Sequence, residues 1–298
     1  MWCSATSWHK MLCSCGPVLS VLTLPTFLAV TFSTRTPLPA PHLAPPHHRF
    51  PVDVVLTFLG AHAVPLEYKG NPDGYIDTVL SSLEILAKEG LVDCVDAFCE
   101  TVGFSVEQTK RVFDKATELQ LPVRLHGDQL HDFGGASLAA QYKALSCDHC
   151  EHTSPAGVQA MADAGTVAVL LPAATYFIKE QSRPPVALFR EKKVPIALAT
   201  NCNPGSAPCT SILLVMNMGC TLMGLSPEEA LLGVTINAAK ALGKEHERGS
   251  IEVGKMGDFA VWGCQDLVEL SYYLGFNQLV SVYKKGKLVG GGIQEGKL

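Results

Sequence analysis

The sequence of 298 residues lacks the marks of a nucleic-acid-binding or membrane protein. No basic stripe occurs along the chain, and the formal net charge is −5, so a nucleic-acid partner is not expected. The apolar run from Val18 to Phe32 is broken by Pro25 and is too short for a transmembrane helix. We therefore expect neither a nucleic acid nor a membrane as partner, and a small-molecule substrate fits the composition better.

A disulfide framework is also missing. The chain has 11 cysteines, an odd number, and they are spread without regular spacing. This pattern is typical of buried free thiols in a reducing compartment, and it predicts a cytoplasmic protein.

Residues 1–50 differ from the rest of the chain. Behind a start rich in Cys, Ser and Trp, the apolar run with Lys10 ahead of it imitates a secretory signal. The Pro-rich stretch from Thr36 to His48 can form neither a helix nor a central strand. We expect residues 1–50 to be an atypical, disordered segment produced by alternative splicing or a gene-model error, with a targeting signal as the alternative.

From residue 51 the sequence alternates between strand and helix patterns. Strands are expected at Val52–His62, Val92–Phe98, Pro122–His126, Cys147–His149, Thr166–Pro172 and Val194–Thr200. Helical patterns follow these strands, and capping boxes at Ser105–Gln108 and Ser226–Glu229 open two of the helices. Six consecutive β/α units imply a parallel sheet covered by helices, either doubly wound or closed as a barrel.

A complete (β/α)₈ barrel needs two more units, which residues 1–50 cannot supply. Residues 51–248 are therefore expected to form the β/α part. Residues 249–298 show short strands and Gly turns that end in Val280–Val289, which predicts a small C-terminal β-rich segment.

Histidine and amide residues stand at the carboxyl ends of four of these strands, where parallel α/β folds place their chemistry. The ends carry His62, His126-Gly-Asp-Gln129, Asp148-His149, and Thr200-Asn-Cys-Asn-Pro-Gly-Ser206. Because such ends converge on one cavity, their shared position predicts a common site.

These strings resemble those of the imidazolonepropionase family of metal-dependent amidohydrolases. The similar segments are Phe58–Pro65, His126–Gln129, Asp148-His149 with Glu151, Leu170–Pro172, Asn203–Ser206 and Gly249–Trp262. The resemblance runs from about residue 51 to the C-terminus. It implies an incomplete (β/α)₈ barrel of the TIM type, whose six units are the third to eighth.

The resemblance also implies a site with one metal, Zn²⁺ or Fe³⁺. In that family the ligands are a His-x-His pair ending the first strand, a His ending the fifth and an Asp ending the eighth. His126 matches the fifth-strand ligand, and Asn201 stands at the position of the Asp, which both binds metal and shuttles a proton. His149 matches the residue that positions and deprotonates the attacking water.

The remaining matches concern the substrate and the reaction. The resemblance implies that His62 and Gln129 contact an imidazolone ring. It also implies that the loop of Asn203, Gly205 and Ser206 holds substrate and product. It implies hydrolysis of 4-imidazolone-5-propanoate to N-formimidoyl-L-glutamate in histidine degradation, by a homodimer.

Two departures bear on the activity. No His-x-His triplet occurs in the chain, and the Asp position holds Asn201. An amide neither neutralises a metal's charge nor accepts a proton at neutral pH. We expect this polypeptide to be inactive or nearly so.

Three alternatives remain. One is another cyclic amidohydrolase or deaminase of the same superfamily, and a second is an inactive truncated isoform or remnant. The third is a small zinc module at Cys147–His152, for which Cys147 and Cys150 have ligand spacing but no second pair follows.

Overall fold

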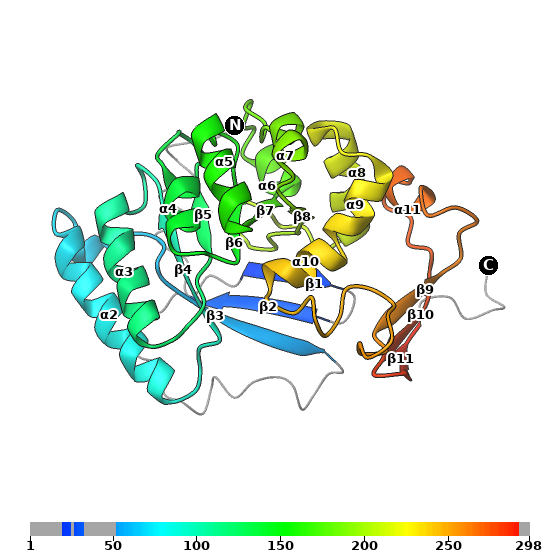
Figure 1. Ribbon diagram of the computed structural model, residues 1–298, viewed down its shortest axis with the longest axis horizontal. Coiled ribbons are helices and arrows are strands. Elements are labelled where there is room, and N and C mark those ends of the chain that lie inside the picture. Colours follow the sequence, from blue (N-terminus) through cyan, green and yellow to red (C-terminus); the bar gives the residue numbers. More distant parts are fainter. Residues whose placement is uncertain (1–19, 25–26, 33–51, 292–298) are drawn as a thin grey trace.

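The computed structural model describes residues 20–24, 27–32 and 52–291 (Figure 1). The strands are β1 (Ser20–Leu24), β2 (Phe27–Phe32), β3 (Asp53–Ala61), β4 (Cys94–Cys99), β5 (Leu125–Gly127), β6 (Ser146–His149), β7 (Val167–Leu170), β8 (Ile196–Leu198), β9 (Phe259–Trp262), β10 (Leu279–Lys284) and β11 (Lys287–Gly290). The helices are η3 (Leu66–Tyr68), α2 (Pro72–Lys88), α3 (Val106–Glu118), α4 (Gly135–Gln141), α5 (Pro155–Ala164), α6 (Pro172–Phe177), α7 (Val186–Lys192), α8 (Ile212–Met223), α9 (Pro227–Gly233), α10 (Ile236–Ala241) and α11 (Glu269–Tyr272).

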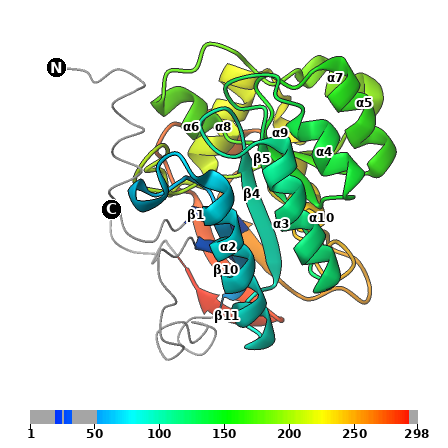
Figure 2. The same cartoon turned by 90° about the vertical axis from the view of Figure 1, so that its left-hand side faces the viewer.

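The main sheet contains strands β1 to β8 in chain order. Strands β3 to β8 are all parallel, and a helix lies between each consecutive pair. Figures 1 and 2 show these helices on the outside of the sheet, with α2 and α3 side by side. The six β/α units and the incomplete (β/α)₈ barrel predicted from the sequence are confirmed.

Strands β1 and β2 are an addition that the sequence analysis did not expect. They pair with each other antiparallel, and β2 pairs parallel with β3. Both segments are rich in Val, Leu, Thr and Phe, which suit a strand. Only two residues separate β1 from β2, so they are strands without a β/α unit. The Pro-rich stretch from Thr36 to His48 lies outside the described residues.

Helix α2 shows how local sequence sets the elements. The Asn71 side chain accepts a hydrogen bond from the backbone N–H of Gly74, and Pro72 occupies the first turn. Ile76, Val79 and Leu83 recur at helical spacing and are buried against the sheet. The helix thus begins at its cap and turns its apolar face toward the core.

Helices α3 and α9 both begin with the capping boxes that the sequence predicted. In α3 the Ser105 hydroxyl accepts from the Gln108 N–H, and the Gln108 side chain accepts from the Ser105 N–H. Ser226 and Glu229 make the same reciprocal pair in α9.

A second sheet, of order β11-β10-β9, is antiparallel and lies to one side of the main sheet (Figure 1). A group of charged side chains joins it to β3. Arg248 contacts Asp53 at 2.7 Å and Asp258 at 3.1 Å, and Lys284 contacts the same two carboxylates. In the described part of the chain, no helix has the length and apolar character needed to cross a bilayer.

Candidate active site

Three histidine rings gather at the carboxyl ends of neighbouring strands. His62 follows β3 directly, His126 lies in β5, and His149 is the last residue of β6. The ring centroids of His62 and His126 are 6.4 Å apart, and those of His126 and His149 are 5.5 Å apart. The structure therefore brings together the three histidines that the sequence analysis placed at strand ends.

The strand register sets the neighbours of His126. In the parallel ladder His126 lies opposite Asp148 on β6 and opposite Phe98 on β4. Residues paired in this way point to the same face of the sheet. The Phe98 ring stacks on the His62 ring at a centroid distance of 5.7 Å and meets the edge of His126 at 6.4 Å. An aromatic wall therefore borders the histidine cluster.

His126 lies among buried charged groups. Its Nδ1 is 2.9 Å from an Asp96 carboxylate oxygen, although the ring N–H is not aligned for a hydrogen bond. Burial opposes a charge on the ring, but the negative charges of Asp96 and Asp148 outweigh it and raise the pKa of His126 to about 9. Arg124 is also buried and acts against that shift.

Asp96 was missed by the sequence analysis. It lies in the middle of β4, where all six residues are buried. A carboxylate within a fully apolar strand is rare unless it is paired, so Asp96 was itself a signal. Arg124, whose guanidinium donates to the Thr57 hydroxyl, was a second such signal.

The loop after β6 supplies a further carboxylate. His149 and Cys150 have left-handed backbone conformations, with φ of 82° and 66°. This turn returns Glu151 toward His149, and one Glu151 oxygen lies 3.8 Å from His149 Nδ1. The other oxygen accepts a 2.7 Å hydrogen bond from the Thr175 hydroxyl of α6.

Hydrogen bonds within the loop after β8 define its turn. The Asn203 side-chain oxygen accepts from the N–H groups of Gly205 at 2.9 Å and Ser206 at 2.8 Å. The Asn203 amide nitrogen donates to the Asn201 carbonyl at 2.7 Å. Asn201 and Asn203 are buried, so the structure places this predicted binding loop at the strand ends as a preformed turn.

Asp128 organises the loop after β5. It accepts hydrogen bonds from the N–H groups of Gly135 at 2.8 Å and Ala136 at 3.0 Å, and from the Thr153 hydroxyl at 3.2 Å. Gly135 has to be glycine, since a Cβ there would lie 2.9 Å from the Gly127 Cα. The next residue, Gln129, is buried at the same strand end.

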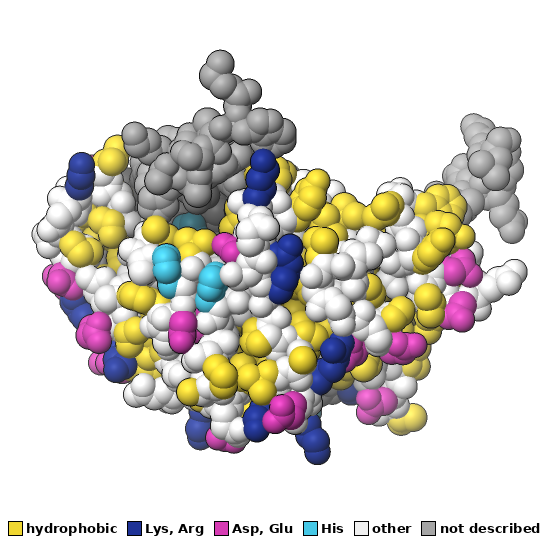
Figure 3. Space-filling model, turned by 90° about the horizontal axis from the view of Figure 1, so that it is seen from above, with side chains coloured by type: hydrophobic (Ala, Val, Ile, Leu, Met, Phe, Trp, Pro, Cys, Tyr) yellow, Lys and Arg dark blue, Asp and Glu magenta, His cyan; other side chains and the backbone are white. Residues whose placement is uncertain are grey.

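Seen from above, histidine side chains also appear at the surface, next to apolar and acidic groups (Figure 3). His131 is the most exposed of those near the β5 loop, with 57% of its side chain accessible, and its Nδ1 lies 3.1 Å from the buried Glu100 carboxylate. Glu100 also accepts from the N–H groups of Leu130 and His131. This contact holds the loop in place.

The residues available for a metal differ from those expected. Among the described residues, the one group of three close potential ligands is Asp96, His126 and Asp148, all buried. Of the ligands expected from the sequence, the chain holds only His126 as a strong donor. The other expected position holds the amide of Asn201. A catalytic zinc takes three protein ligands, so the expected set is incomplete among the described residues, and Asp96 and Asp148 are the carboxylates that lie close enough to His126 to join it.

The zinc-module alternative is not supported by the packing. Cys147 and Cys150 are free, fully buried and part of the hydrophobic core. The Cys150 thiol donates to the Cys147 carbonyl at 3.3 Å. Both thiols therefore act as small core residues, and a side-chain interaction with the Cys150 thiol, together with burial, raises the pKa of the Cys147 thiol.

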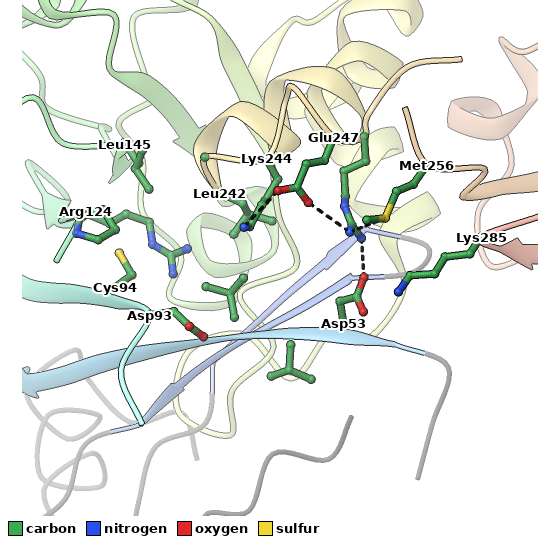
Figure 4. Close-up of a pocket in the computed structure, with 15 residues that line it drawn as sticks. Asp53, Asp93, Cys94, Arg124, Leu145, Leu242, Lys244, Glu247, Met256 and Lys285 are labelled. Carbon is green, nitrogen blue, oxygen red and sulfur yellow. Dashed lines mark hydrogen bonds and ion pairs between the residues drawn. The ribbon is translucent and has the colours of Figure 1, made fainter. Parts of the chain in front are cut away.

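A cavity of about 570 Å³ lies at the opposite, amino-terminal ends of the strands (Figure 4). Asp53, Asp93, Cys94, Arg124 and Arg248 are among its lining residues. It opens at the other edge of the parallel sheet from the histidine cluster, and Arg124, which lines it, also acts on the charge of His126.

Comparison with known proteins agrees with this architecture. The model of the amidohydrolase family matches residues 83–289. The imidazolonepropionase of Cupriavidus necator is 52% identical over 240 residues, which are 80% of this chain and 58% of that protein. The imidazolonepropionase of Shewanella oneidensis is 52% identical over 244 residues, or 82% and 59% of the two chains. The chain thus spans less than two thirds of the length of these relatives.

Solved structures share the fold at low identity. A zinc-bound adenosine deaminase of Xanthomonas campestris has a TM-score of 0.60 at 20% identity, covering 79% of this chain and 60% of its own. A zinc complex of atrazine chlorohydrolase from Arthrobacter aurescens has a TM-score of 0.66 at 14% identity, covering 88% and 68%. Since the family model matches more than half of the residues, the chain belongs to the amidohydrolase family.

Proposed function

We propose that this protein is an imidazolonepropionase-type hydrolase, which opens the ring of 4-imidazolone-5-propanoate to N-formimidoyl-L-glutamate in histidine degradation. The observation that carries the proposal is the convergence of His62, His126 and His149 at the strand carboxyl ends. Relatives that carry the name imidazolonepropionase and share 52% of their aligned residues with this chain support the choice of substrate.

Each residue has a proposed task. His62 and Gln129 contact the imidazolone ring, with the Phe98 ring holding His62 in place. The loop of Asn203, Gly205 and Ser206 holds the substrate, and its turn is preformed by the Asn203 side chain. A preformed loop lowers the ordering cost of binding.

His149 is the proposed base. It takes a proton from the attacking water, and the hydroxide formed adds to the ring carbonyl. His126 is the proposed metal ligand, and we propose zinc or iron as the metal of the whole protein. Such a metal lowers the pKa of bound water to about 7 when bound.

Asn201 limits this chemistry. The proton taken from water has to reach the leaving ring nitrogen, and an amide cannot relay it at neutral pH. Of the metal ligands expected for the family, the described residues hold only His126 as a strong donor, where three are needed. We therefore propose that this chain alone turns over its substrate slowly or not at all, and an inactive remnant is the second candidate.

Two measurements test the proposal. Calorimetry should detect binding of N-formimidoyl-L-glutamate to the purified chain, and His62→Ala and Gln129→Ala should weaken it at least tenfold, or about 1.4 kcal/mol. An absence of binding would contradict the proposed substrate. With added zinc or iron, loss of imidazolonepropionate at about 10 per second, the typical enzyme rate, would contradict the proposed lack of activity.

We also propose a homodimer in the cytoplasm, with the small-molecule substrate as the other partner. Sedimentation velocity of the purified chain distinguishes monomer from dimer. The division into residues 1–50, 51–248 and 249–298 stays a prediction.

A further inference from the structure

Two buried polar atoms face each other beside the histidine cluster. His149 Nδ1 and one Glu151 carboxylate oxygen are 3.8 Å apart, and the two side chains are 3% and 0% exposed. Within the described part of the chain, neither atom has a hydrogen-bond partner. Such an arrangement is uncommon, because buried polar atoms are nearly always paired.

The two atoms complement each other chemically. A carboxylate oxygen only accepts, and a neutral imidazole carries one N–H donor on either of its two nitrogens. An N–H···O hydrogen bond spans about 2.9 Å, so a small rotation of either side chain closes the gap of about 0.9 Å. Catalytic hydrogen bonds are often this loose before substrate binds.

Thr175 fixes the far side of Glu151. Its hydroxyl donates at 2.7 Å to the other carboxylate oxygen and lies 3.3 Å from the Leu171 carbonyl. Thr175 and Glu151 are both buried, so water does not compete for this contact. Glu151 is thereby held between α6 and the His149 ring.

We propose that Glu151 is a positioning residue for His149: it accepts a hydrogen bond from Nδ1–H and so keeps the lone pair on Nε2. The role of His149 as base rests on the proposed function, while the pairing itself does not. Thr175 positions Glu151 in turn. The acceptor beside one ring nitrogen decides which nitrogen carries the proton.

This arrangement suits proton transfer. The water O–H bond breaks, its proton binds the Nε2 lone pair, and the hydroxide keeps the electron pair for attack on the carbonyl carbon. Glu151 then faces an imidazolium whose charge it stabilises, without itself becoming protonated.

The tautomer of His149 tests the proposal directly. The full chain, labelled with ¹⁵N in its histidines, is studied by long-range ¹H–¹⁵N NMR without metal or substrate, and His149→Asn assigns the signal. We expect the Nδ1–H form as the major tautomer. Glu151→Gln and Thr175→Val should make it the minor one, while Thr175→Ser, which keeps the hydroxyl, should restore it.

Glu180→Gln is the matched control. Glu180 lies 3.8 Å from His152 Nε2, the same separation as in the proposed pair, and this variant should leave the His149 tautomer unchanged. A major Nε2–H form in the wild type would overturn the proposal. The proposal would also be overturned if the Glu151→Gln variant had the same His149 tautomer and the same thermal unfolding as the wild type.

The two Thr175 variants decide the matter if Glu151→Gln fails to fold. If the Thr175→Val and Thr175→Ser variants then had the same major tautomer of His149, the proposal would be rejected. The NMR experiment measures the His149 tautomer and not turnover. A chain without activity can therefore still show the expected tautomer, whereas a wrongly assigned positioning residue cannot.

Discussion

At the scale of single residues, His126 combines two requirements that conflict. A histidine ready to bind a metal has to be neutral, whereas Asp96 and Asp148 favour its charged form and raise its pKa to about 9. The same contact acts on Asp96. Burial raises the pKa of this carboxyl, but the positive charges of His126 and Arg124, together with hydrogen bonding, lower it by a larger amount, so the pKa lies below its ordinary value. In this chain the buried ion pair therefore opposes the metal-ligand role proposed for His126.

The pKa of His126 predicts how stability depends on pH. Because the folded-state pKa is raised from 6.5 to about 9, the contribution is fully present below pH 6.5 and is lost as the pH rises through about 9. The unfolding free energy should therefore fall between these values, by at most about 3 kcal/mol. Urea unfolding at several pH values measures it.

Asp96→Asn tests whether His126 causes this change of the unfolding free energy with pH. It removes the nearest negative charge, so its unfolding free energy should change less between pH 6.5 and 9 than that of the wild type. Glu100→Gln, which removes a different buried carboxylate near His131, should keep the wild-type slope. Equal slopes for Asp96→Asn and the wild type would show that another group titrates.

Asn201→Asp restores a carboxylate at the carboxyl end of β8, where the resemblance expects a metal ligand. We expect this variant to bind Co²⁺ or Zn²⁺ at least tenfold more tightly than the wild type, about 1.4 kcal/mol, because a carboxylate neutralises part of the metal's charge. Visible absorption of Co²⁺ during a titration measures the affinity. Asn71→Asp adds the same charge at the α2 cap, where Asp is equally suited, and should leave the metal affinity unchanged.

At this scale the sequence predicted the histidines but not their surroundings. His62, His126 and His149 were recognisable because each ends a strand pattern. The contact between Asp96 and His126 depends on the register of β4 and β5, and a shift of one residue would turn either side chain to the other face. Strand patterns alone do not fix that register.

At the scale of elements, capping decides where helices begin. Ser105→Ala removes the hydroxyl that accepts the Gln108 N–H at the start of α3, and it should lower the unfolding free energy by about 1 kcal/mol. Urea unfolding measures the loss. Ser81→Ala, whose hydroxyl only bonds back to the Asp77 carbonyl within α2, should cost far less. Equal costs would show that the box does not contribute.

Element boundaries followed the sequence more closely in helices than in strands. The cap residues Ser105 and Ser226 marked α3 and α9 to the residue. The strand predicted at Pro122–His126 is β5, which spans Leu125–Gly127 and so contains only the last two predicted residues. The residues before Leu125 pair with β4 only through an isolated bridge between Val123 and Val95, so the regular ladder begins later than the apolar run.

At the scale of the whole molecule, the order of the parallel strands was predictable and the long-range contacts were not. Alternating β and α patterns predicted six neighbouring strands, since sequential units lie side by side. The ion pairs that bind the second sheet to β3 join segments far apart in the chain. Arg248 and Lys284 reach Asp53 across 195 and 231 positions, a distance that no local pattern spans.

These ion pairs carry the last prediction. Asp258, with 3% of its side chain exposed, contacts both Arg248 and Lys284, whose side chains are 6% and 8% exposed. Asp258→Ala therefore leaves two buried cations short of a carboxylate, and breaking such a buried pair costs about 3 kcal/mol. Lower unfolding free energy and earlier proteolysis between the two sheets should follow. Glu252→Gln, which loses an exposed pair with Lys255, should behave as the wild type. If Asp258→Ala is no less stable than Glu252→Gln, hydrophobic contacts rather than these charges hold the second sheet against the barrel.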